Sequence, residues 1–440
     1  MFSKILIANR GEIAVRVIRA CKEMGISTVA VYSQPDADAL HVALADESYC
    51  IGGSDASDSY LNEERIISAA LVSGAQAIHP GYGFLSENTR FAENCVKNGV
   101  AFIGPSAENM RRLGDKAGAK KIMAEAGLTV IPGRVGIDSL ESALKAAQEI
   151  GYPVMLKACA GGGGRGIRLV KKPELMEGAY LAARSESEAA FGDGSIYMEK
   201  YIHPARHIEV QLLADEFGNA VCLGERDCSV QRRNQKLIEE APSPALNDGQ
   251  RRALFEKCVA AVKEIGYTGV GTMEFLYNGG HFYFMEMNVR LQVEHTVTES
   301  VTGIDIVKWQ IRAAAGVELN FKQEDVTMAG TAIECRINAR APGKVNFMHV
   351  PGGPFVRFDT YLLTGSEVTP YYDALLGKLI VCASLREEAL RKMKAALCEL
   401  VIDGVANNIE EQLGIVGGDE FMDGSYDLLF LERKSKQKEL

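Results

Sequence analysis

The sequence lacks any apolar stretch long enough to span a bilayer, and its first residues, MFSKILIANRGE, lack the long apolar core of a signal peptide. A basic stripe is also missing. The formal net charge is −10, and the lysines and arginines are scattered through helical patterns. We therefore expect a cytoplasmic protein whose main task involves neither membranes nor nucleic acid.

Several signatures of metal and nucleophile chemistry are absent as well. There is no Gly-x-Ser-x-Gly sequence, and the turn after the first predicted strand has one glycine where a dinucleotide fingerprint needs three. The ten cysteines form no Cys-x-x-Cys pair, so we expect reduced, mostly buried thiols. Cysteines with apolar neighbours are Cys21, Cys95, Cys258 and Cys398. Histidines without zinc-site spacing, interpreted as structural, are His79, His203, His207 and His281.

A chain of 440 residues is too long for one compact core, and its patterns divide it into three regions. In residues 1–114, β-rich runs alternate with amphipathic helical runs, which predicts a parallel sheet flanked by helices. Residues 115–327 combine a helix, two strands around a glycine loop, and a long hairpin. Residues 328–440 mix short strands with one clear helix. The predicted fold class is therefore multidomain, with an N-terminal parallel α/β domain, a central domain and a C-terminal mixed α+β domain.

The glycine run at 161–166 lies between two strand patterns, so it is predicted to be a hairpin tip and not the strand-to-helix turn of a P-loop. Glycine backbone N–H groups can approach phosphate oxygens closely, and glycine allows the positive φ angles that an anion-binding nest needs. The alternative is a flexible surface loop. Lys157, at the end of the preceding strand, favours phosphate binding.

The runs GTMEFLY and HFYFMEMN are joined through Asn278-Gly279-Gly280, a strong hairpin signal. Folding at this turn brings Glu274 roughly opposite Glu286, with Asn288 on the same face as Glu286. Facing carboxylates repel each other, and a divalent cation would remove that repulsion. The hairpin therefore predicts a Mg²⁺ or Mn²⁺ site. The alternative is a pair of glutamates on a solvent-exposed sheet.

The segment RLQVEH follows the hairpin directly. The planar fork of Arg290 suits a pair of carboxylate, carbonate or phosphate oxygens, and Glu294 could accept a proton from a bound substrate. A plain Arg290–Glu294 ion pair is the alternative. Two weaker clusters are the mixed-charge stretch 225–236, which is typical of solvated surface, and Arg336, inside a strand pattern and either paired in a core or reaching into a cleft.

Eight strings together resemble the biotin carboxylase subunits of the ATP-grasp superfamily over nearly the whole chain. They are IANRGEIAVRVIRA, HPGYGFLSEN, KACAGGGGRGIRLV, MEKYI, ERDCSVQRRNQK, MEMNVRLQVEH, ECRINA and PYYDALLGKLIV. The resemblance implies a ligase that uses ATP and bicarbonate to carboxylate biotin. It also implies an N-terminal domain at 1–114, an ATP-grasp domain at 115–327 with a mobile lid at about 131–203, and a C-terminal domain at 328–440.

The resemblance assigns residues to the nucleotide and to two Mg²⁺ or Mn²⁺ ions. Lys116 and Lys157 would hold phosphates under the glycine loop, and the run 199–202 would pair with adenine. The complete set implied for ATP is Lys116, Lys157, Gly163, Gly164, Gly166, Glu199, Lys200, Ile202, His207, Gln231 and Asn234. The implied metal ligands are Glu274, Glu286 and Asn288, in agreement with the hairpin argument.

The resemblance also implies a two-step reaction. Glu294 acts as general base on bicarbonate, which attacks the γ-phosphate of ATP to give carboxyphosphate and ADP. Carboxyphosphate then yields CO₂ and phosphate, the phosphate deprotonates biotin, and Arg336 stabilises the enolate. Residues matched to the bicarbonate site are Lys236, Arg290, Gln292 and Val293, and those matched to biotin are Arg336 and Tyr82. The implied catalytic residues are Arg290, Glu294, Lys236 and Arg336.

No Ala-Met-Lys-Met acceptor sequence occurs in the chain, so biotin is expected on a separate biotin carboxyl carrier protein. The resemblance further implies carboxyltransferase subunits, a homodimer, and acetyl-CoA as the acyl acceptor, in fatty acid synthesis. The alternatives are a subunit of a pyruvate or propionyl-CoA carboxylase, an ATP-grasp ligase that joins a carboxylate to an amine, and a degenerate nucleotide-binding regulatory subunit.

The sequence departs from the family pattern at two places. Asn234 stands where many relatives have histidine, at the edge of the implied nucleotide pocket. After ECRINA, Arg340-Ala341 leads straight to Pro342-Gly343-Lys344, whereas relatives carry an acidic, proline-containing segment there. The shortened loop is expected to alter biotin access or carrier docking, because it is close in sequence to Arg336.

Overall fold

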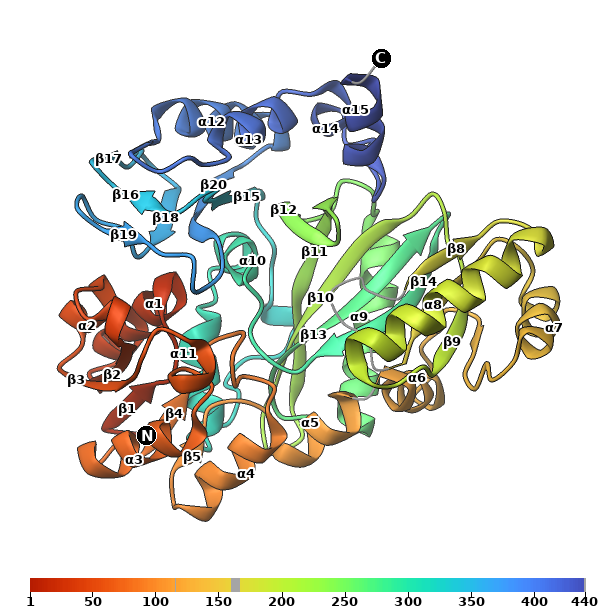
Figure 1. Ribbon diagram of the computed structural model, residues 1–440. Helices are drawn as coiled ribbons and strands as arrows, with labels where there is room; N and C mark the ends of the chain where they lie inside the picture. Colours follow the sequence, from red (N-terminus) through yellow and green to blue (C-terminus); the bar gives the residue numbers. More distant parts are fainter. Residues whose placement is uncertain (115, 160–166, 439–440) are drawn as a thin grey trace.

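The computed structural model describes residues 1–114, 116–159 and 167–438. The N-terminal region is a five-stranded, fully parallel sheet in the order β3-β2-β1-β4-β5, with helices packed around it (Figure 1). Its strands are β1 (Lys4–Ile7), β2 (Ser27–Ser33), β3 (Glu47–Gly52), β4 (Ala77–His79) and β5 (Ala101–Phe102). The helices are α1 (Gly11–Glu23), α2 (Leu40–Leu44), α3 (Glu63–Ser73), α4 (Thr89–Lys97) and α5 (Ala107–Gly114). The predicted parallel α/β arrangement is confirmed.

The centre of the molecule is an eight-stranded sheet in the order β14-β13-β10-β11-β12-β15-β20-β18. Five of its strands come from the central region: β10 (Arg206–Ala214), β11 (Ala220–Arg232), β12 (Gln235–Ala241), β13 (Gly269–Asn278) and β14 (His281–Asn288). The other three are β15 (Thr331–Asn338), β18 (Val356–Thr360) and β20 (Leu375–Ala383). Because β12 pairs with β15, one sheet contains strands from both sides of residue 328, where the C-terminal domain was predicted to begin. The exact domain limits remain predictions.

Alternation along β10 gives this sheet an apolar face and a polar face. Ile208, Val210 and Leu212 belong to a core cluster with residues of α9 (Asp248–Glu264). Glu209 and Gln211, on the opposite face, both accept hydrogen bonds from Arg226, which also bonds to α10 (His295–Thr302). The period of two in the strand therefore places charged side chains on the face where α10 lies.

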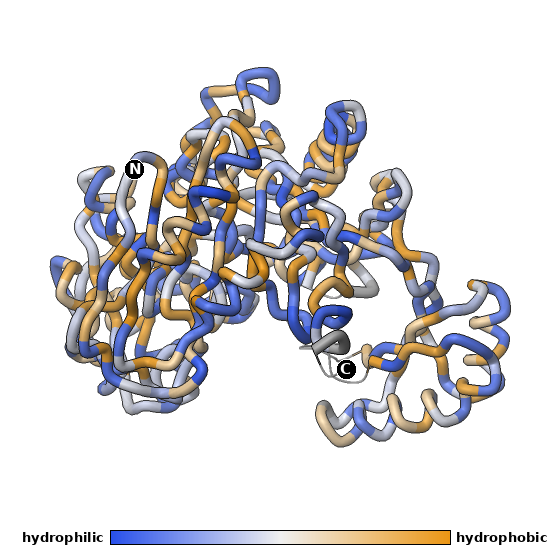
Figure 2. Tube along the Cα trace, turned by 90° about the horizontal axis from the view of Figure 1, so that it is seen from above, coloured by the Kyte–Doolittle hydropathy of each residue, from blue (hydrophilic) through white to orange (hydrophobic). Residues whose placement is uncertain are grey.

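A separate lobe, on the right in Figures 1 and 2, has a four-stranded sheet in the order β6-β9-β7-β8. Its strands are β6 (Gly133–Arg134), β7 (Val154–Ala158), β8 (Arg168–Val170) and β9 (Ile196–Lys200), and its helices are α7 (Leu140–Ile150) and α8 (Met176–Phe191). Val154, Leu156 and Val170 pack into a hydrophobic cluster confined to this lobe. The strands β7 and β8 are antiparallel and flank the glycine run, so the predicted strands on either side of it are confirmed.

The remaining elements are distributed over all three regions of the chain. The helices are α6 (Lys116–Glu125), α11 (Ile306–Ala314), α12 (Arg386–Glu399), α13 (Ile409–Val416), α14 (Asp419–Met422) and α15 (Phe430–Lys438). The short strands are β16 (Gly343–Lys344), β17 (Phe347–His349), β19 (Glu367–Val368) and β21 (Val401–Asp403). One-turn 3-10 helices are η1 (Gln34–Asp36), η2 (Ala56–Asp58), η3 (Pro173–Leu175) and η4 (Gln323–Asp325). Among the described helices, none has the length and apolar character to cross a membrane.

Most of the cysteines are buried, as predicted, but one of the four with apolar neighbours is not. Cys21, Cys95 and Cys258 are buried, but Cys398 is exposed. The buried stripe of α12 passes through Met393, Ala396 and Leu397, and Cys398 lies one position beyond it, toward solvent.

Candidate active site

The β13–β14 hairpin pairs Glu274 with Glu286 and Thr272 with Asn288. The predicted opposition of the two carboxylates is therefore confirmed. Asn288 Nδ2 donates a hydrogen bond of 2.7 Å to Glu274 Oε1. Glu274 is 5% exposed and Glu286 is half-buried, so the alternative of two glutamates on an open, solvated sheet does not describe this hairpin. Two carboxylates and an amide oxygen form a donor set that suits Mg²⁺ or Mn²⁺.

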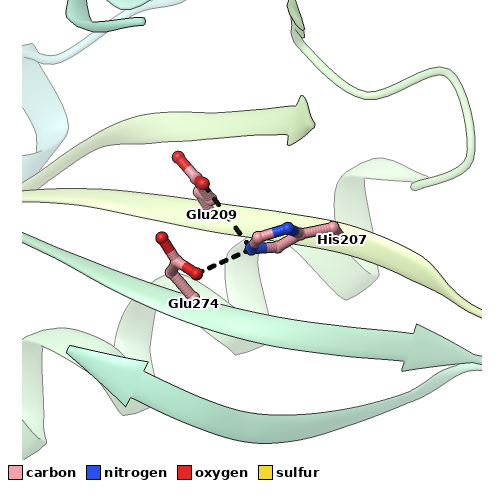
Figure 3. A group of neighbouring side chains, drawn as sticks. All are labelled: His207, Glu209 and Glu274. Atoms are coloured by element: carbon pink, nitrogen blue, oxygen red, sulfur yellow. Dashed lines mark ion pairs between the residues drawn. The ribbon is translucent and has the colours of Figure 1, made fainter. Parts of the chain in front are cut away.

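His207 and Glu209, both on β10, extend this polar group (Figure 3). His207 Nε2 lies 2.9 Å from Glu274 Oε2 and 3.6 Å from Glu209 Oε1. Gln231 Nε2 lies 2.6 Å from His207 Nδ1 on the other side of the ring. Burial lowers the pKa of His207, but the Glu274 carboxylate outweighs burial and the pKa is raised. His207 is therefore a partner of a predicted metal ligand, and its role in nucleotide binding stays a prediction.

Lys236 of β12 is the central cation of the site. Its Nζ lies 2.7 Å from Glu294 Oε1 and 3.2 Å from Glu274 Oε1, and it also hydrogen-bonds to Glu209. Burial lowers the pKa of Lys236, but these three carboxylates raise it well above its ordinary value. Lys236 is therefore charged at neutral pH. It could exchange one of its carboxylate partners for an anionic substrate.

Glu294 immediately precedes α10 and is fully buried. Its second oxygen accepts a hydrogen bond of 2.8 Å from Nη2 of Arg336. The Nε of the same arginine donates a hydrogen bond of 2.6 Å to Glu239 Oε1. Burial raises the pKa of Glu294, but Lys236 and Arg336 hold it well below its ordinary value. The carboxylate is therefore ionised, the state in which it can accept a proton.

Arg290 bonds to residues other than Glu294. Its Nε donates to Glu87 Oε2 at 3.0 Å, and its Nη2 donates to Asn288 Oδ1 at 2.9 Å. Its Nη1 donates to Gln292 Oε1 at 3.0 Å, and Gln292 Nε2 donates to Glu274 Oε1 at 3.1 Å. The alternative of an Arg290–Glu294 ion pair is wrong. Arg290 and Gln292 instead connect the loop after β14 to the predicted metal ligands.

The residues implied for the nucleotide are divided between the lobe and the large sheet. Lys157 Nζ lies 2.6 Å from Glu199 Oε2, which places both side chains on one face of the lobe sheet. Lys200 Nζ donates to the carbonyl oxygens of Gly151 and Tyr152, at 2.9 and 3.0 Å. Ile202 follows β9, and Lys116 begins α6. The glycines Gly163, Gly164 and Gly166 lie outside the described residues.

Asn234 has a structural role that explains the amino acid at this position. Arg232 pairs with Gln235, so Arg233 and Asn234 form the two-residue tip of the β11–β12 hairpin. Their φ angles are 50° and 64°. Two left-handed residues are typical of a type I′ turn, and asparagine adopts that conformation more readily than most residues. The turn places Lys236 two positions into β12.

The prediction of a solvated surface for 225–236 is wrong at its first residues, because Glu225, Arg226 and Asp227 are buried. Arg226 is fully buried and bonds to Glu209 Oε2 at 3.1 Å and to Thr272 Oγ1 at 3.2 Å. Sequence reasoning also missed Glu209. Polar residues at every second position of RHIEVQLL, between apolar ones, were the signal that could have found it.

Three family models match the chain. They are the biotin carboxylase N-terminal domain at residues 1–110, the carbamoyl-phosphate synthase L chain ATP binding domain at 115–322, and the biotin carboxylase C-terminal domain at 334–433. The biotin carboxylase of Haemophilus influenzae is 51% identical, over 99% of both chains.

Solved structures are similar over the same length. A biotin carboxylase–β,γ-ATP complex from Campylobacter jejuni has a TM-score of 0.95 at 49% identity, covering 98% of this chain and 99% of that one. The biotin carboxylase domain dimer of the 2-oxoglutarate carboxylase of Hydrogenobacter thermophilus, with MgADP, ADP and bicarbonate, has a TM-score of 0.94 at 50% identity, covering 99% and 98%.

Proposed function

The chain belongs to the biotin carboxylase family, and from this premise we propose that it is a ligase that carboxylates biotin with ATP and bicarbonate. The observation that carries the proposal is the environment of Glu294. This fully buried carboxylate lies between Lys236 and Arg336, 2.7 and 2.8 Å from their nitrogens. A base for bicarbonate, a cation for its charge and an arginine for the biotin enolate are thus in direct contact.

The nucleotide is proposed to lie between the lobe at about 131–203 and the large sheet. Lys116, Lys157 and the glycine loop hold its phosphates, and the run 199–202 together with His207 and Gln231 lines the rest of the pocket. Glu274, Glu286 and Asn288 hold Mg²⁺ or Mn²⁺, as two ions. These ions neutralise phosphate charge when bound. Closure of the lobe excludes water from the reacting groups.

In the first proposed step, Arg290, Lys236, Gln292 and Val293 hold bicarbonate beside Glu294. Glu294 takes the bicarbonate proton, and an oxygen of the resulting carbonate attacks the γ-phosphorus. The bond from this phosphorus to the β,γ-bridging oxygen breaks, so the products are carboxyphosphate and ADP. Lys236 and Arg290 stay charged throughout and balance the negative charge that builds up.

In the second proposed step, carboxyphosphate breaks into CO₂ and phosphate. The phosphate removes the N1′ proton of biotin, and Arg336 donates hydrogen bonds to the ureido oxygen as it gains charge. The nitrogen then attacks CO₂ to form the N-carboxylate. Tyr82 is proposed to lie beside the ureido ring. Arg336 already has two carboxylate partners, so biotin adds a third oxygen to a preoriented guanidinium.

We also propose partners and an acyl acceptor for this reaction. Biotin is carried by a separate biotin carboxyl carrier protein, carboxyltransferase subunits use the product, and the chain forms a homodimer. We propose acetyl-CoA as the acyl acceptor, in malonyl-CoA and fatty acid synthesis, with pyruvate and propionyl-CoA as the alternatives. The shortened loop at 340–343 is proposed to alter how the carrier reaches Arg336.

The proposal is tested by measuring ADP release from MgATP with bicarbonate and free biotin each present or omitted. We expect turnover to require bicarbonate and to rise severalfold with biotin, because biotin accepts the carboxyl group and so speeds the consumption of carboxyphosphate. An ATP-grasp ligase acting on an amine would ignore biotin, and a degenerate regulatory subunit would bind ATP without turnover. Either of those results would overturn the proposal.

A further inference from the structure

Lys378 is a lysine with no exposed surface in the middle of β20. In the antiparallel pairing of β15 with β20 it is the direct partner of Arg336. Like charges directly opposite each other destabilise such a pair. Arg336 is neutralised by Glu239 and Glu294, so Lys378 needs a counterion of its own. Its ion-pair partner is Glu12 of α1, 3.2 Å from Lys378 Nζ, whereas Asp359, opposite Lys378 on β18, is paired with Arg357.

The Glu12–Lys378 pair connects three parts of the chain that are far apart in sequence. Lys378 Nζ donates a hydrogen bond of 2.8 Å to the carbonyl oxygen of Val293. Glu12 also accepts a hydrogen bond from the hydroxyl of Tyr82. Glu12 and Tyr82 line a cavity of about 200 Å³. One ion pair therefore touches both the loop that leads into Glu294 and the tyrosine assigned to biotin.

The contact with Val293 controls the peptide that leads into Glu294. The carbonyl of Val293 and the N–H of Glu294 belong to one planar unit, so holding the oxygen sets the orientation of the whole peptide. The carbonyl oxygen of Gln292, one residue earlier, lies 2.9 Å from His295 Nδ1. A carbonyl only accepts, so that nitrogen carries the hydrogen. Two successive carbonyls are thus held by buried donors.

Stability alone does not account for a buried pair of this kind. A buried ion pair contributes little net stability relative to apolar residues of the same volume, because removing two charges from water offsets their attraction. Glu12 has a second buried oxygen with no hydrogen-bond partner among the described residues. Burying this pair therefore costs free energy, and its contacts with Val293 and Tyr82 indicate a role other than stability.

We propose that Lys378 and Glu12 are positioning residues for biotin carboxylation: Lys378 orients the Val293–Glu294 peptide, and Glu12 holds Lys378 and the Tyr82 hydroxyl together. The pair thereby fixes the loop at 290–294, which is proposed to hold bicarbonate, relative to Tyr82, which is proposed to lie beside biotin. Neither residue contacts the reacting atoms. The inference rests on the proposed function, because it assigns a geometric task within that reaction.

The test uses Lys378→Met, Glu12→Gln and the double variant in the full chain, with biotin-stimulated ADP release and thermal unfolding as readouts. We expect Lys378→Met to lower kcat about 100-fold, because a displacement near 1 Å has effects of that order. Glu12→Gln is expected to lower kcat about tenfold, the weight of one charged hydrogen bond. KM for ATP should change by less than about twofold, since the pair is remote from the lobe. The double variant should match Lys378→Met, because the two residues act as one unit.

Glu225→Gln is the matched control. Glu225 of β11 is also fully buried and forms an ion pair with Arg251 of α9, at 2.7 Å, but its partners do not include the loop that leads into Glu294. We expect it to lower the unfolding temperature while leaving kcat unchanged. The positioning role would be overturned if Glu225→Gln and Glu12→Gln lost kcat equally. It would also be overturned if folded Glu12→Gln and Lys378→Met kept the wild-type kcat. Neither result would affect the proposed function. If Lys378→Met does not fold, Glu12→Gln and Lys378→Arg decide, with kcat expected nearer to wild type for Lys378→Arg than for Glu12→Gln. Absence of biotin-stimulated turnover in the wild type would instead overturn the proposed function.

Discussion

Replacing Glu294 by glutamine is expected to lower biotin-stimulated ADP release by about 10²- to 10⁴-fold, the usual contribution of a general base. The amide has the size of the carboxylate, but it keeps only one acceptor oxygen, whereas Lys236 and Arg336 donate to different oxygens of Glu294. It cannot accept a proton from bicarbonate at neutral pH. The measurement is kcat with saturating MgATP, bicarbonate and biotin.

Glu240→Gln is the control for this substitution. Glu240 is the neighbour of Glu239 on β12, but it faces the other way and pairs with Arg386 at 2.7 Å. Both variants remove one buried carboxylate, Glu240 from β12 and Glu294 from the loop before α10, and only one of them removes the proposed base. Glu294→Gln retaining more than about a tenth of the wild-type kcat would contradict the role of Glu294.

Removal of divalent cations by EDTA is expected to reduce ADP release to background, and added Mg²⁺ or Mn²⁺ is expected to restore it. Glu274 and Glu286 are opposite each other, and a bound triphosphate adds further negative charge next to them. Without a cation these groups repel one another. The measurement is the initial rate of ADP release as a function of free metal concentration.

Glu286→Gln separates metal binding by the protein from the need for MgATP. With ATP saturated as its magnesium complex, the variant should need about tenfold more free Mg²⁺ for half-maximal rate. Glu324→Gln, which alters an exposed carboxylate in η4, should leave that concentration unchanged. An unchanged metal requirement in Glu286→Gln would remove Glu286 from the metal site.

Much of the fold could be predicted because local patterns specify it. The alternation of β-rich and helical runs before residue 114 gives parallel pairing. The Asn278-Gly279-Gly280 signal predicts the β13–β14 hairpin, and a β-bulge between Glu274 and Phe275 shifts the register by one residue so that Glu274 lies opposite Glu286. The edge strand β3 was not predicted, because only one of its six residues is buried, and α2 was not predicted, because five residues make little more than one helical turn. The continuation of the sheet from β12 into β15 could not be predicted, since it joins strands about 90 residues apart.

The candidate site was predictable where its residues lie next to each other in sequence. Glu286, Asn288, Arg290 and Glu294 follow one another within a single hairpin and loop, so spacing alone groups them. Lys378 and Glu12 were missed, because their contacts with the loop depend on how distant strands and helices meet. Arg226 was misread as exposed, since its charged neighbours resemble a surface stretch and only strand pairing shows its burial.

The most direct test of the account follows the carboxyl carbon from ¹³C-bicarbonate to free biotin by mass spectrometry, with ADP measured in the same reaction. We predict N1′-carboxybiotin that carries the label, forms only when ATP is present, and disappears in Glu294→Gln. ADP formation in the presence of biotin without any labelled carboxybiotin would contradict it.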